Sequence, residues 1–225
     1  MILLNYTSLD GLLPHSAVRL FLQNLPLNKA QSLSRLVDDK QRTASILGLV
    51  LLKNAVQQLD IRDFSYHQLN FSPNRKPSSS TNIEFNITHS DNVVACAVSQ
   101  KSALGIDSET MEHNHNPLLR HVFNETELQQ IDDGTQNFFN LWVKKEAVAK
   151  AIGCGVTGMK HIQVDQHTAH YQNQLWYLHQ LALHDNDVSY LACKQPVPDV
   201  KAHHYSFSDC LNLCTIKNVL SQSHG

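Results

Sequence analysis

Leu-Gly-Ile-Asp-Ser-Glu, residues 104–109, places two carboxylates directly behind a short apolar lead-in. We expect an extended backbone here, from which Asp107 and Glu109 project on the same face, about 6 to 7 Å apart along the strand. Two adjacent anions repel each other. The repulsion is tolerable if both are solvated at a strand end, if one takes up a proton, or if a cation lies between them. This stretch alone is also compatible with a strand that ends in a polar turn.

A second stretch, residues 142–153, favours a functional interpretation. Its good helix formers, its apolar spacing and its terminal Gly153 predict one helix with a glycine cap. Trp142, Glu146 and Lys150 recur every four residues and therefore share one stripe of this helix. The stripe could be a core anchor followed by a surface ion pair, which contributes only about 0.2 to 0.5 kcal/mol. A third carboxylate and a lysine on one line instead favour a site shared with the two upstream carboxylates.

Four motifs, in this order and at these spacings, resemble those of the 4'-phosphopantetheinyl transferases of the surfactin-synthetase-activating type. They are Asn-Ile-Thr-His-Ser at 86–90, Gly-Ile-Asp-Ser-Glu at 105–109, Trp-Val-Lys-Lys-Glu at 142–146 with Lys150, and Gly-Cys-Gly at 153–155. The resemblance spans roughly residues 70–156, and no single motif is decisive by itself.

The resemblance implies a mixed α/β (α+β) fold, the 4'-phosphopantetheinyl transferase fold. Two similar α/β halves are expected to pack in a pseudo-two-fold arrangement with the active site in the cleft. We expect an N-terminal half-domain at residues 1–103, a C-terminal half-domain with the metal site at 104–195, and a variable C-terminal tail at 196–225.

The hydrophobic pattern itself predicts the main elements of the first half. Residues 1–6 favour a first strand, and residues 27–59 favour two helical segments. Extended segments at 83–88, 93–99 and 103–107 are joined by short polar turns. We therefore expect these three segments to form an antiparallel meander.

The resemblance implies an enzyme, a phosphopantetheinyl transferase of the holo-[acyl-carrier-protein] synthase type. It would move 4'-phosphopantetheine from coenzyme A to a serine of an apo acyl or peptidyl carrier protein and release adenosine 3',5'-bisphosphate. The expected metal is Mg²⁺, with Mn²⁺ as an alternative. Such carriers serve fatty acid, polyketide or nonribosomal peptide biosynthesis, and the sequence does not indicate which of them is served. A cytoplasmic monomer is expected.

Roles for individual residues follow from the resemblance. The expected metal ligands are Asp107, Glu109 and Glu146. The expected catalytic residues are Glu146, Glu127 and Lys150, and the serine proton would go to Glu127, Glu146 or a metal-bound water. Glu127 belongs to a helix that is expected to begin at Asn116-Pro117. The residues expected to bind coenzyme A are Arg42, Lys76, Thr88, His89, Ser90 and Lys150. Arg75 stands where the family has a glycine before its lysine and proline.

Composition excludes several other classes of protein. The chain has 225 residues, a net charge of -2 and 17% charged residues, so no overall positive field attracts it to nucleic acid or an anionic membrane. The five cysteines lack C-x-x-C spacing, which favours reduced thiols in the cytoplasm. The N-terminus has no early positive charge, so we expect no signal peptide. The fourteen histidines, His113 and His115 among them, match no closed zinc site.

Two alternatives remain open at this stage. A divalent-metal nuclease also needs clustered carboxylates and a lysine, but its lysine usually follows a glutamate by two residues, whereas Lys145 precedes Glu146. A non-catalytic homologue that binds carrier proteins would keep the same surface without turnover. Retention of the three carboxylates and of Lys150 argues against this second alternative.

Overall fold

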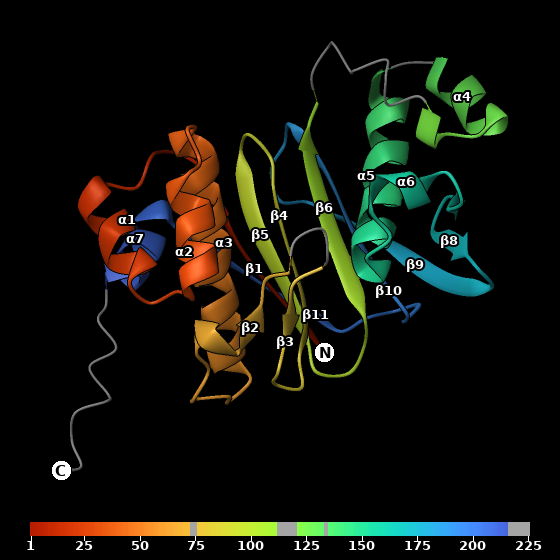
Figure 1. Ribbon diagram of the computed structural model, residues 1–225. Helices are drawn as coiled ribbons and strands as arrows, with labels where there is room; N and C mark the ends of the chain where they lie inside the picture. Colours follow the sequence, from red (N-terminus) through yellow and green to blue (C-terminus); the bar gives the residue numbers. More distant parts are fainter. Residues whose placement is uncertain (73–75, 112–120, 133–134, 216–225) are drawn as a thin grey trace.

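The computed structural model describes residues 1–72, 76–111, 121–132 and 135–215 (Figure 1). Arg75, His113, His115, the expected helix start at Asn116-Pro117 and the last ten residues of the chain lie outside the described residues. The fold is mixed α/β, as predicted. No described helix is long and apolar enough to cross a bilayer.

The first part of the chain contains most of one sheet and the helices that cover it. Its elements are β1 (Ile2–Ser8), α1 (His15–Leu22), α2 (Leu27–Ser34), α3 (Asp39–Gln58), η1 (Tyr66–Gln68), β2 (Leu69–Asn70), β3 (Ser78–Ser79), β4 (Glu84–His89) and β5 (Val93–Ser99). The predicted helical region is divided between α2 and α3. Asp38 caps α3, because its side chain accepts hydrogen bonds from the backbone N–H groups of Lys40 and Gln41.

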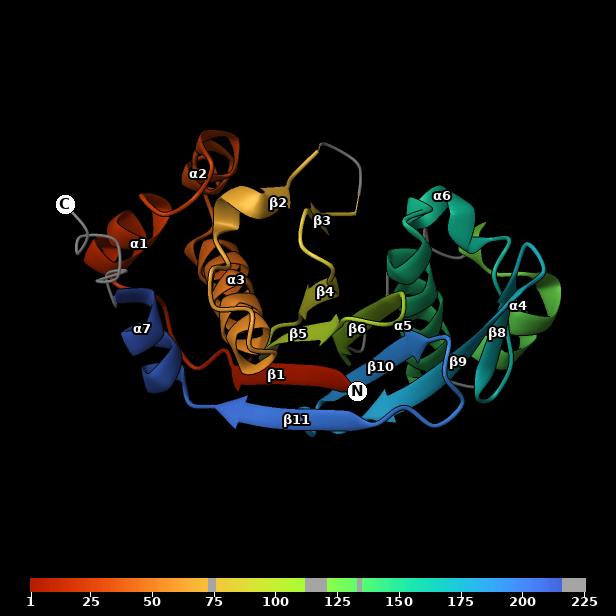
Figure 2. The same cartoon turned by 90° about the horizontal axis from the view of Figure 1, so that it is seen from below.

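The second part begins with the strand that carries the paired carboxylates. Its elements are β6 (Leu104–Thr110), α4 (Glu125–Asp132), α5 (Thr135–Ile152), α6 (Gly155–Met159), β7 (Gln163–Val164), β8 (Thr168–Tyr171), β9 (Gln174–Leu181), β10 (Asp187–Cys193), β11 (Val200–Tyr205) and α7 (Phe207–Thr215). The strands form a four-stranded sheet in the order β11-β1-β5-β4 and a five-stranded sheet in the order β6-β10-β9-β8-β7. Figures 1 and 2 show α3 and α5 on opposite sides of these two sheets.

The predicted meander is wrong in its third strand. β4 and β5 pair antiparallel, but β6 pairs with β10 and begins the other sheet. Side chains of β4 take the place of a backbone ladder between β4 and β6. The backbone N–H of Ile106 donates to Oδ1 of Asn86 at 3.0 Å, and that of Ser108 donates to Oγ1 of Thr88 at 3.2 Å. These two bonds join the halves and leave β6 free to pair on its other side.

Strand alternation sorts side chains among three cores and decides which way the carboxylates face. One core lies under α3 and a second under α5. A third core gathers residues from both sheets: Ile2, Leu4, Ala95, Ala97, Leu104, Ile106, Leu191 and Cys193. Because Leu104 and Ile106 of β6 enter this third core, Gly105, Asp107 and Glu109 lie on the opposite face, toward α5.

Gly105 allows α5 to lie against β6. A Cβ atom at this position would stand 2.1 Å from the carbonyl oxygen of Ala147 and 2.5 Å from the backbone nitrogen of Ala151. Both atoms belong to the helix backbone and cannot rotate away, as a side chain could. The glycine of the motif therefore sets the distance between the strand and the helix that carry the site.

The C-terminal residues differ from the predicted tail. β11 adds to the first sheet parallel to β1, with Ile2 opposite Val200, and α7 follows it. Cys210 and Cys214 of α7 are buried in the core under α3. Residues 200–215 are therefore an integral part of the first half. All five cysteines are free, in line with the expected thiols.

Candidate functional site

Carboxylates from β6 and α5 converge at the centre of the molecule. Asp107, Glu109 and Glu146 each offer an oxygen, and these ligand atoms all lie within 4.8 Å of one another. Asp107 is 2% exposed, and the two glutamates are half-buried. Three residues from two distant parts of the sequence thus form one compact set of oxygen ligands, the type that Mg²⁺ prefers.

The predicted stripe of α5 faces these carboxylates. The indole Nε1 of Trp142 donates to Oε1 of Glu109 at 3.4 Å, and Nζ of Lys150 donates to Oδ1 of Asp107 at 2.6 Å. Trp142, at the start of the stripe, thus contacts the end of β6. Lys150, at the end of the stripe, contacts the middle of β6. Helix and strand therefore run in opposite directions, and Glu146 comes between the two contacts.

The cluster concentrates negative charge that one lysine does not balance. Burial, followed by the negative charge of Asp107, raises the pKa of both Glu109 and Glu146 to about 7. Burial opposes the charge on Lys150, but the carboxylates of Asp107 and Glu146 outweigh it and raise the pKa of its ammonium group. Within the described part of the chain, Oδ2 of Asp107 is buried without a hydrogen-bond partner. A divalent cation would supply both the missing partner and the missing charge.

Thr88 connects this cluster to the first half. Its hydroxyl donates to Oδ1 of Asp107 at 3.2 Å and accepts from Nζ of Lys150 at 3.3 Å, in addition to the backbone N–H of Ser108. All of these contacts are within the protein. The structure thus gives Thr88, which was predicted to bind coenzyme A, a part in orienting Asp107 and Lys150.

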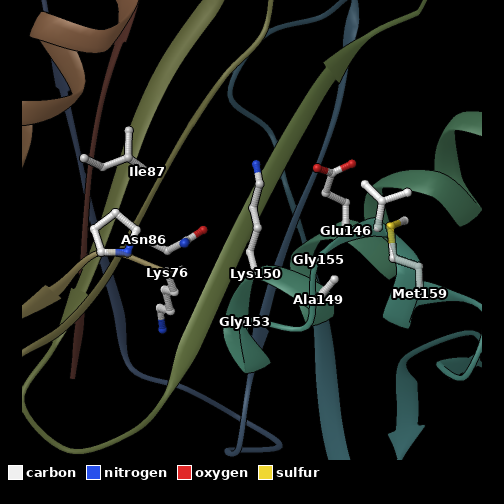
Figure 3. A pocket seen from close by; sticks show the side chains of 11 residues that line it. Lys76, Asn86, Ile87, Glu146, Ala149, Lys150, Gly153, Gly155 and Met159 are labelled. Carbon is white, nitrogen blue, oxygen red and sulfur yellow. The ribbon is translucent and has the colours of Figure 1, made fainter. Parts of the chain in front are cut away.

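Two pockets flank the cluster. The first has a volume of about 460 Å³, and Lys76, Asn86 and Ile87 of the first half face Glu146 and Lys150 across it (Figure 3). Gly153, Gly155 and Met159 complete its wall on the side of α6. Lys76 also donates to Oε2 of Glu84 and to the carbonyl of Leu104, each at 3.1 Å. This pocket combines an apolar wall with two cationic side chains.

The second pocket, with a volume of about 330 Å³, opens beside Glu109. Lys40, Gln41 and Asp91 line it together with His89. His89 ends β4 and is exposed, and packing around its ring together with the charge of Lys150 lowers its pKa. Glu146 thus lines one pocket and Glu109 the other, so the carboxylate cluster lies between them.

The predicted contact of Arg42 with coenzyme A stays a prediction. Its guanidinium pairs with Asp39 on the same helix, and Arg42 does not line either of these pockets. Lys40 lines the second pocket instead. Because Asp38 is the cap of α3, Lys40 falls in the first turn, and its ammonium group pairs with Asp91 in the turn after β4. The cap indicates where α3 begins, but no sequence pattern pairs Lys40 with residue 91.

Ser90 has a hydroxyl that is committed within the protein. Its Oγ donates to Oδ2 of Asp187 and accepts from the backbone N–H groups of Asn92 and Val93. The predicted contact of Ser90 with coenzyme A would therefore require one of these bonds to break. Sequence motifs could not indicate this, since Asp187 lies far along the chain.

Glu127 does not join the carboxylate cluster. Its Oε2 lies 2.9 Å from Nζ of Lys145 and accepts from the backbone N–H of Asn124, while Asn124 accepts from the backbone N–H of Glu127. Lys145 is fully buried and also donates to the carbonyls of Met159 and Ile162. The reciprocal bonds of Asn124 and Glu127 thus cap α4, and Lys145 ties α5 to α4 and to the end of α6. This is a structural arrangement.

Comparison with known proteins agrees with this geometry. Residues 103–196 match the family model of the 4'-phosphopantetheinyl transferase superfamily. The 4'-phosphopantetheinyl transferase gsp of Aneurinibacillus migulanus is 35% identical over 141 residues, which are 59% of this chain and 58% of the relative. The 4'-phosphopantetheinyl transferase Sfp of Bacillus subtilis (strain 168) is 29% identical over 128 residues, 53% of this chain and 55% of the relative. These alignments span less than two thirds of the relatives' own length. The matched segment contains β6 and α5, and hence the whole carboxylate cluster.

Proposed function

We propose that this chain is a 4'-phosphopantetheinyl transferase, because residues 103–196 match the family model of that superfamily. It would transfer the 4'-phosphopantetheine arm of coenzyme A to a serine of an apo acyl or peptidyl carrier protein. The observation that carries this proposal is the convergence of Asp107, Glu109 and Glu146 within 4.8 Å, beside Lys150 and between two pockets. The free cysteines agree with a cytoplasmic protein, and we expect it to act as a monomer.

The reaction is a phosphoryl transfer. The carrier serine oxygen forms a bond to the β-phosphorus of coenzyme A, and the bond between that phosphorus and the bridging oxygen of the pyrophosphate breaks. Adenosine 3',5'-bisphosphate leaves with the bonding electrons, and the serine proton goes to a base. Such transfers depend on positioning and on neutralisation of charge more than on covalent chemistry by the protein.

The residues fit a divalent metal ion. Asp107, Glu109 and Glu146 would hold it, since they provide carboxylate oxygens in one compact set and Oδ2 of Asp107 has no partner among the described residues. When bound, Mg²⁺ or Mn²⁺ would offset negative charge on the pyrophosphate, which can contribute several kcal/mol.

Side chains of the pocket walls would hold the phosphates. Lys150 lines the first pocket and keeps its charge because of the surrounding carboxylates, so it can donate to a phosphate oxygen as well as to Asp107. Lys76 and His89 approach from the first half, on the two sides of the cluster. A bound phosphate would favour the charged imidazole of His89, against the present lowering of its pKa.

Of the two glutamates among the candidate bases, Glu146 is the better placed. It lies in the carboxylate cluster between the two pockets, where one of its two oxygens could hold the metal ion and the other could accept a proton. Glu127 is held by Lys145 and Asn124 outside the cluster. We therefore assign removal of the serine proton to Glu146 and a structural role to Glu127.

The proposal is tested by incubating the purified protein with coenzyme A, Mg²⁺ and apo acyl and peptidyl carrier proteins, and by measuring the mass of the carriers. Carriers should gain the mass of the phosphopantetheine arm on one serine. Asp107→Asn and Glu146→Gln should each lower the rate at least about a hundredfold, because each removes a negatively charged oxygen from the cluster. Glu125→Gln on the exposed surface of α4 is the matched control and should keep the wild-type rate.

Two results would contradict the proposal. If the wild type modifies no carrier but binds one tightly, the chain is a non-catalytic carrier-binding protein. If Asp107→Asn modifies carriers at the wild-type rate, the assignment of the carboxylate cluster is wrong.

A further inference from the structure

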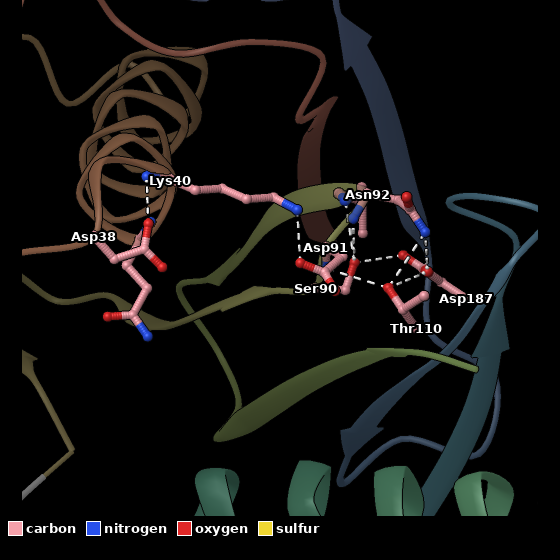
Figure 4. A network of polar contacts seen from close by, with 9 residues as sticks. Asp38, Lys40, Ser90, Asp91, Asn92, Thr110 and Asp187 are labelled. Carbon is pink, nitrogen blue, oxygen red and sulfur yellow. Dashed lines mark hydrogen bonds and ion pairs between the residues drawn. The ribbon is translucent and has the colours of Figure 1, made fainter. Parts of the chain in front are cut away.

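Asp187 forms the centre of a polar network at the open end of the site (Figure 4). It is the first residue of β10, and both of its carboxylate oxygens accept hydrogen bonds. Oδ2 accepts from the hydroxyl of Ser90. Oδ1 accepts from Nδ2 of Asn92 at 2.8 Å and from the hydroxyl of Thr110 at 2.9 Å. One ionisable side chain therefore holds three partners from two other segments.

The network crosses from one half of the molecule to the other. Ser90 and Asn92 belong to the turn between β4 and β5 in the first sheet. Thr110 and Asp187 lie at the end of β6 and the start of β10 in the second sheet. The backbone N–H of Asp91 also donates to the hydroxyl of Thr110, at 3.2 Å. The turn is thereby fastened to the strand that carries the carboxylates.

A carboxylate is required at position 187 by the donors around it. The hydroxyl oxygen of Ser90 already accepts from the backbone N–H groups of Asn92 and Val93, both at 3.1 Å, so its own proton needs an acceptor. The side chain of Asn92 also presents N–H donors. An amide at position 187 would turn its NH₂ group toward one of these donors. Bonds to an ionised acceptor are also stronger than those between neutral groups.

A second tether of the same turn is weaker. Nζ of Lys40 lies 2.6 Å from Oδ1 of Asp91, and this pair links the turn to the start of α3. The two side chains are 45% and 56% exposed, and exposed ion pairs contribute little. Ser90, in contrast, is 9% exposed. The bonds to Asp187 are thus the stronger of the two connections.

The network lies next to functional residues on both sides. His89 directly precedes Ser90, and Glu109 directly precedes Thr110. His89 and Glu109 line the same pocket. The carboxylates that would bind the metal ion all come from β6 and α5, and the first half reaches them through Thr88 of β4. The separation between His89 and Glu109, however, depends on how the two halves are held together at this end.

We propose that Asp187 is a positioning residue that fixes the β4–β5 turn, and with it His89, relative to Glu109. It would thereby set the width of the second pocket, where His89 would hold a phosphate of coenzyme A. This inference rests on the proposed function. It assigns a role to a residue outside the motifs of β4, β6 and α5. Loss of the Asp187 carboxylate should weaken the binding of coenzyme A and leave the rate of the transfer step nearly unchanged.

The test compares Asp187→Asn with Asp185→Asn in the 225-residue chain. Asp185 is an exposed carboxylate in the same β9–β10 turn and serves as the matched control. For Asp187→Asn we expect the KM for coenzyme A to rise about tenfold or more while kcat changes less than about threefold, as for a loss of binding that is uniform along the reaction. An unchanged KM, or a loss confined to kcat, would overturn the inference.

A conservative pair at Thr110 separates positioning from folding. Thr110→Ser keeps the hydroxyl that donates to Asp187 and should keep the wild-type KM for coenzyme A. Thr110→Val keeps the shape of the side chain without the hydroxyl and should raise this KM. If Asp187→Asn does not fold, this pair decides, and equal KM values for Ser and Val would overturn the inference.

The Kd for coenzyme A in the presence of Mg²⁺, measured by calorimetry, keeps the inference distinct from the proposed function. A wild type that binds coenzyme A without transfer would contradict the function alone. A Kd that Thr110→Val does not raise would contradict the inference alone.

Discussion

The carboxylates of Asp107, Glu109 and Glu146 lie close enough together to repel one another in the absence of a cation. Burial and the charge of Asp107 keep the pKa of both glutamates near 7, while Lys150 offsets only part of the negative charge. The metal-free protein therefore holds protons where the active protein would hold a metal ion. Stability and metal binding are linked through the same oxygens.

The metal-free protein should lose stability through Glu146 as the pH rises from about 5 to about 7. The ordinary pKa of this carboxyl is 4.5, and burial first, Asp107 second, raise it to about 7 in the folded protein. Between these values the folded protein binds a proton that the unfolded chain has released. Raising the pH then favours unfolding, by at most about 1.4 kcal/mol per pH unit for one such group. The destabilisation is absent at pH values well below 4.5 and complete above the folded pKa.

Urea unfolding in EDTA, compared between the wild type and Glu146→Gln, measures this contribution. The variant should lose less stability over this range, and Mg²⁺ at pH 8 should stabilise the wild type more than the variant. Equal slopes for the two proteins would contradict the linkage.

The Glu127–Lys145 pair offers a test of structure against catalysis. Glu127→Gln alone leaves the ammonium of Lys145 buried without its partner, and we expect a loss of about 3 to 5 kcal/mol. Glu127→Gln combined with Lys145→Gln restores neutrality and should recover part of that stability. The double variant should also transfer the arm at a rate within about tenfold of the wild type, because no base is removed. A double variant that folds but has no activity would contradict the structural role and indicate that Glu127 takes part in the reaction.

Sequence reasoning brought Asp107, Glu109, Glu146 and Lys150 together, because two simple periods decide which way these side chains face. A strand repeat of two and a helix repeat near four were sufficient once the motifs were aligned. Ser90 was harder to interpret. Its hydroxyl is oriented by Asp187, and no local pattern predicts a partner that lies on a later strand.

At the level of elements, the contact between β6 and α5 builds the site. Gly105→Ala would place a methyl group against the backbone of α5, 2.1 Å from the carbonyl oxygen of Ala147. We expect a loss of about 3 kcal/mol or more in urea unfolding, and a separation of helix and strand that weakens metal binding. Gly11→Ala is the control, since a Cβ atom there meets only the ring of Phe207 at 3.6 Å. Equal stability of the two variants would contradict this account.

The position of β6 shows why the predicted meander failed. Alternation and turn residues identified β4, β5 and β6 as strands, but these features do not say which neighbour a strand will choose. The choice depends on Asn86 and Thr88, whose side chains bond to the backbone of β6 and hold it beside β4 without a ladder. Whether β6 pairs with β5 or with β10 is therefore decided by contacts between distant parts of the fold.

At the level of the whole molecule, the core shared by the two sheets and the strand β11 join segments that are far apart in sequence. The fold class was predictable through motif resemblance, whereas the role of residues 200–215 was not. β11 is exposed along much of its length and lacks the apolar alternation that marks a buried strand. Its place is fixed by pairing with β1.

A chain that ends after residue 198 should therefore lose a stable first half. It lacks β11 and α7, which leaves β1 as an open edge and uncovers the core that Cys210 and Cys214 fill. Several buried side chains at about 1.5 to 3 kcal/mol each amount to much of the usual stability of a domain. Thermal unfolding, compared with a chain that ends at Thr215, should show a lower melting temperature or no cooperative transition. An unchanged melting temperature would contradict the integral role of these elements.

The parallel pairing of β1 with β11 also has a consequence for synthesis on the ribosome. The first sheet is complete only after β11 has been synthesised and has paired with β1, Ile2 opposite Val200. The strands of the second sheet, in contrast, lie between residues 104 and 193. The carboxylate-bearing half can thus assemble on the emerging polypeptide while its companion remains unfinished. The proposed transfer would begin only after residues 200–215 have been synthesised, so a nascent chain stalled before them would not consume coenzyme A.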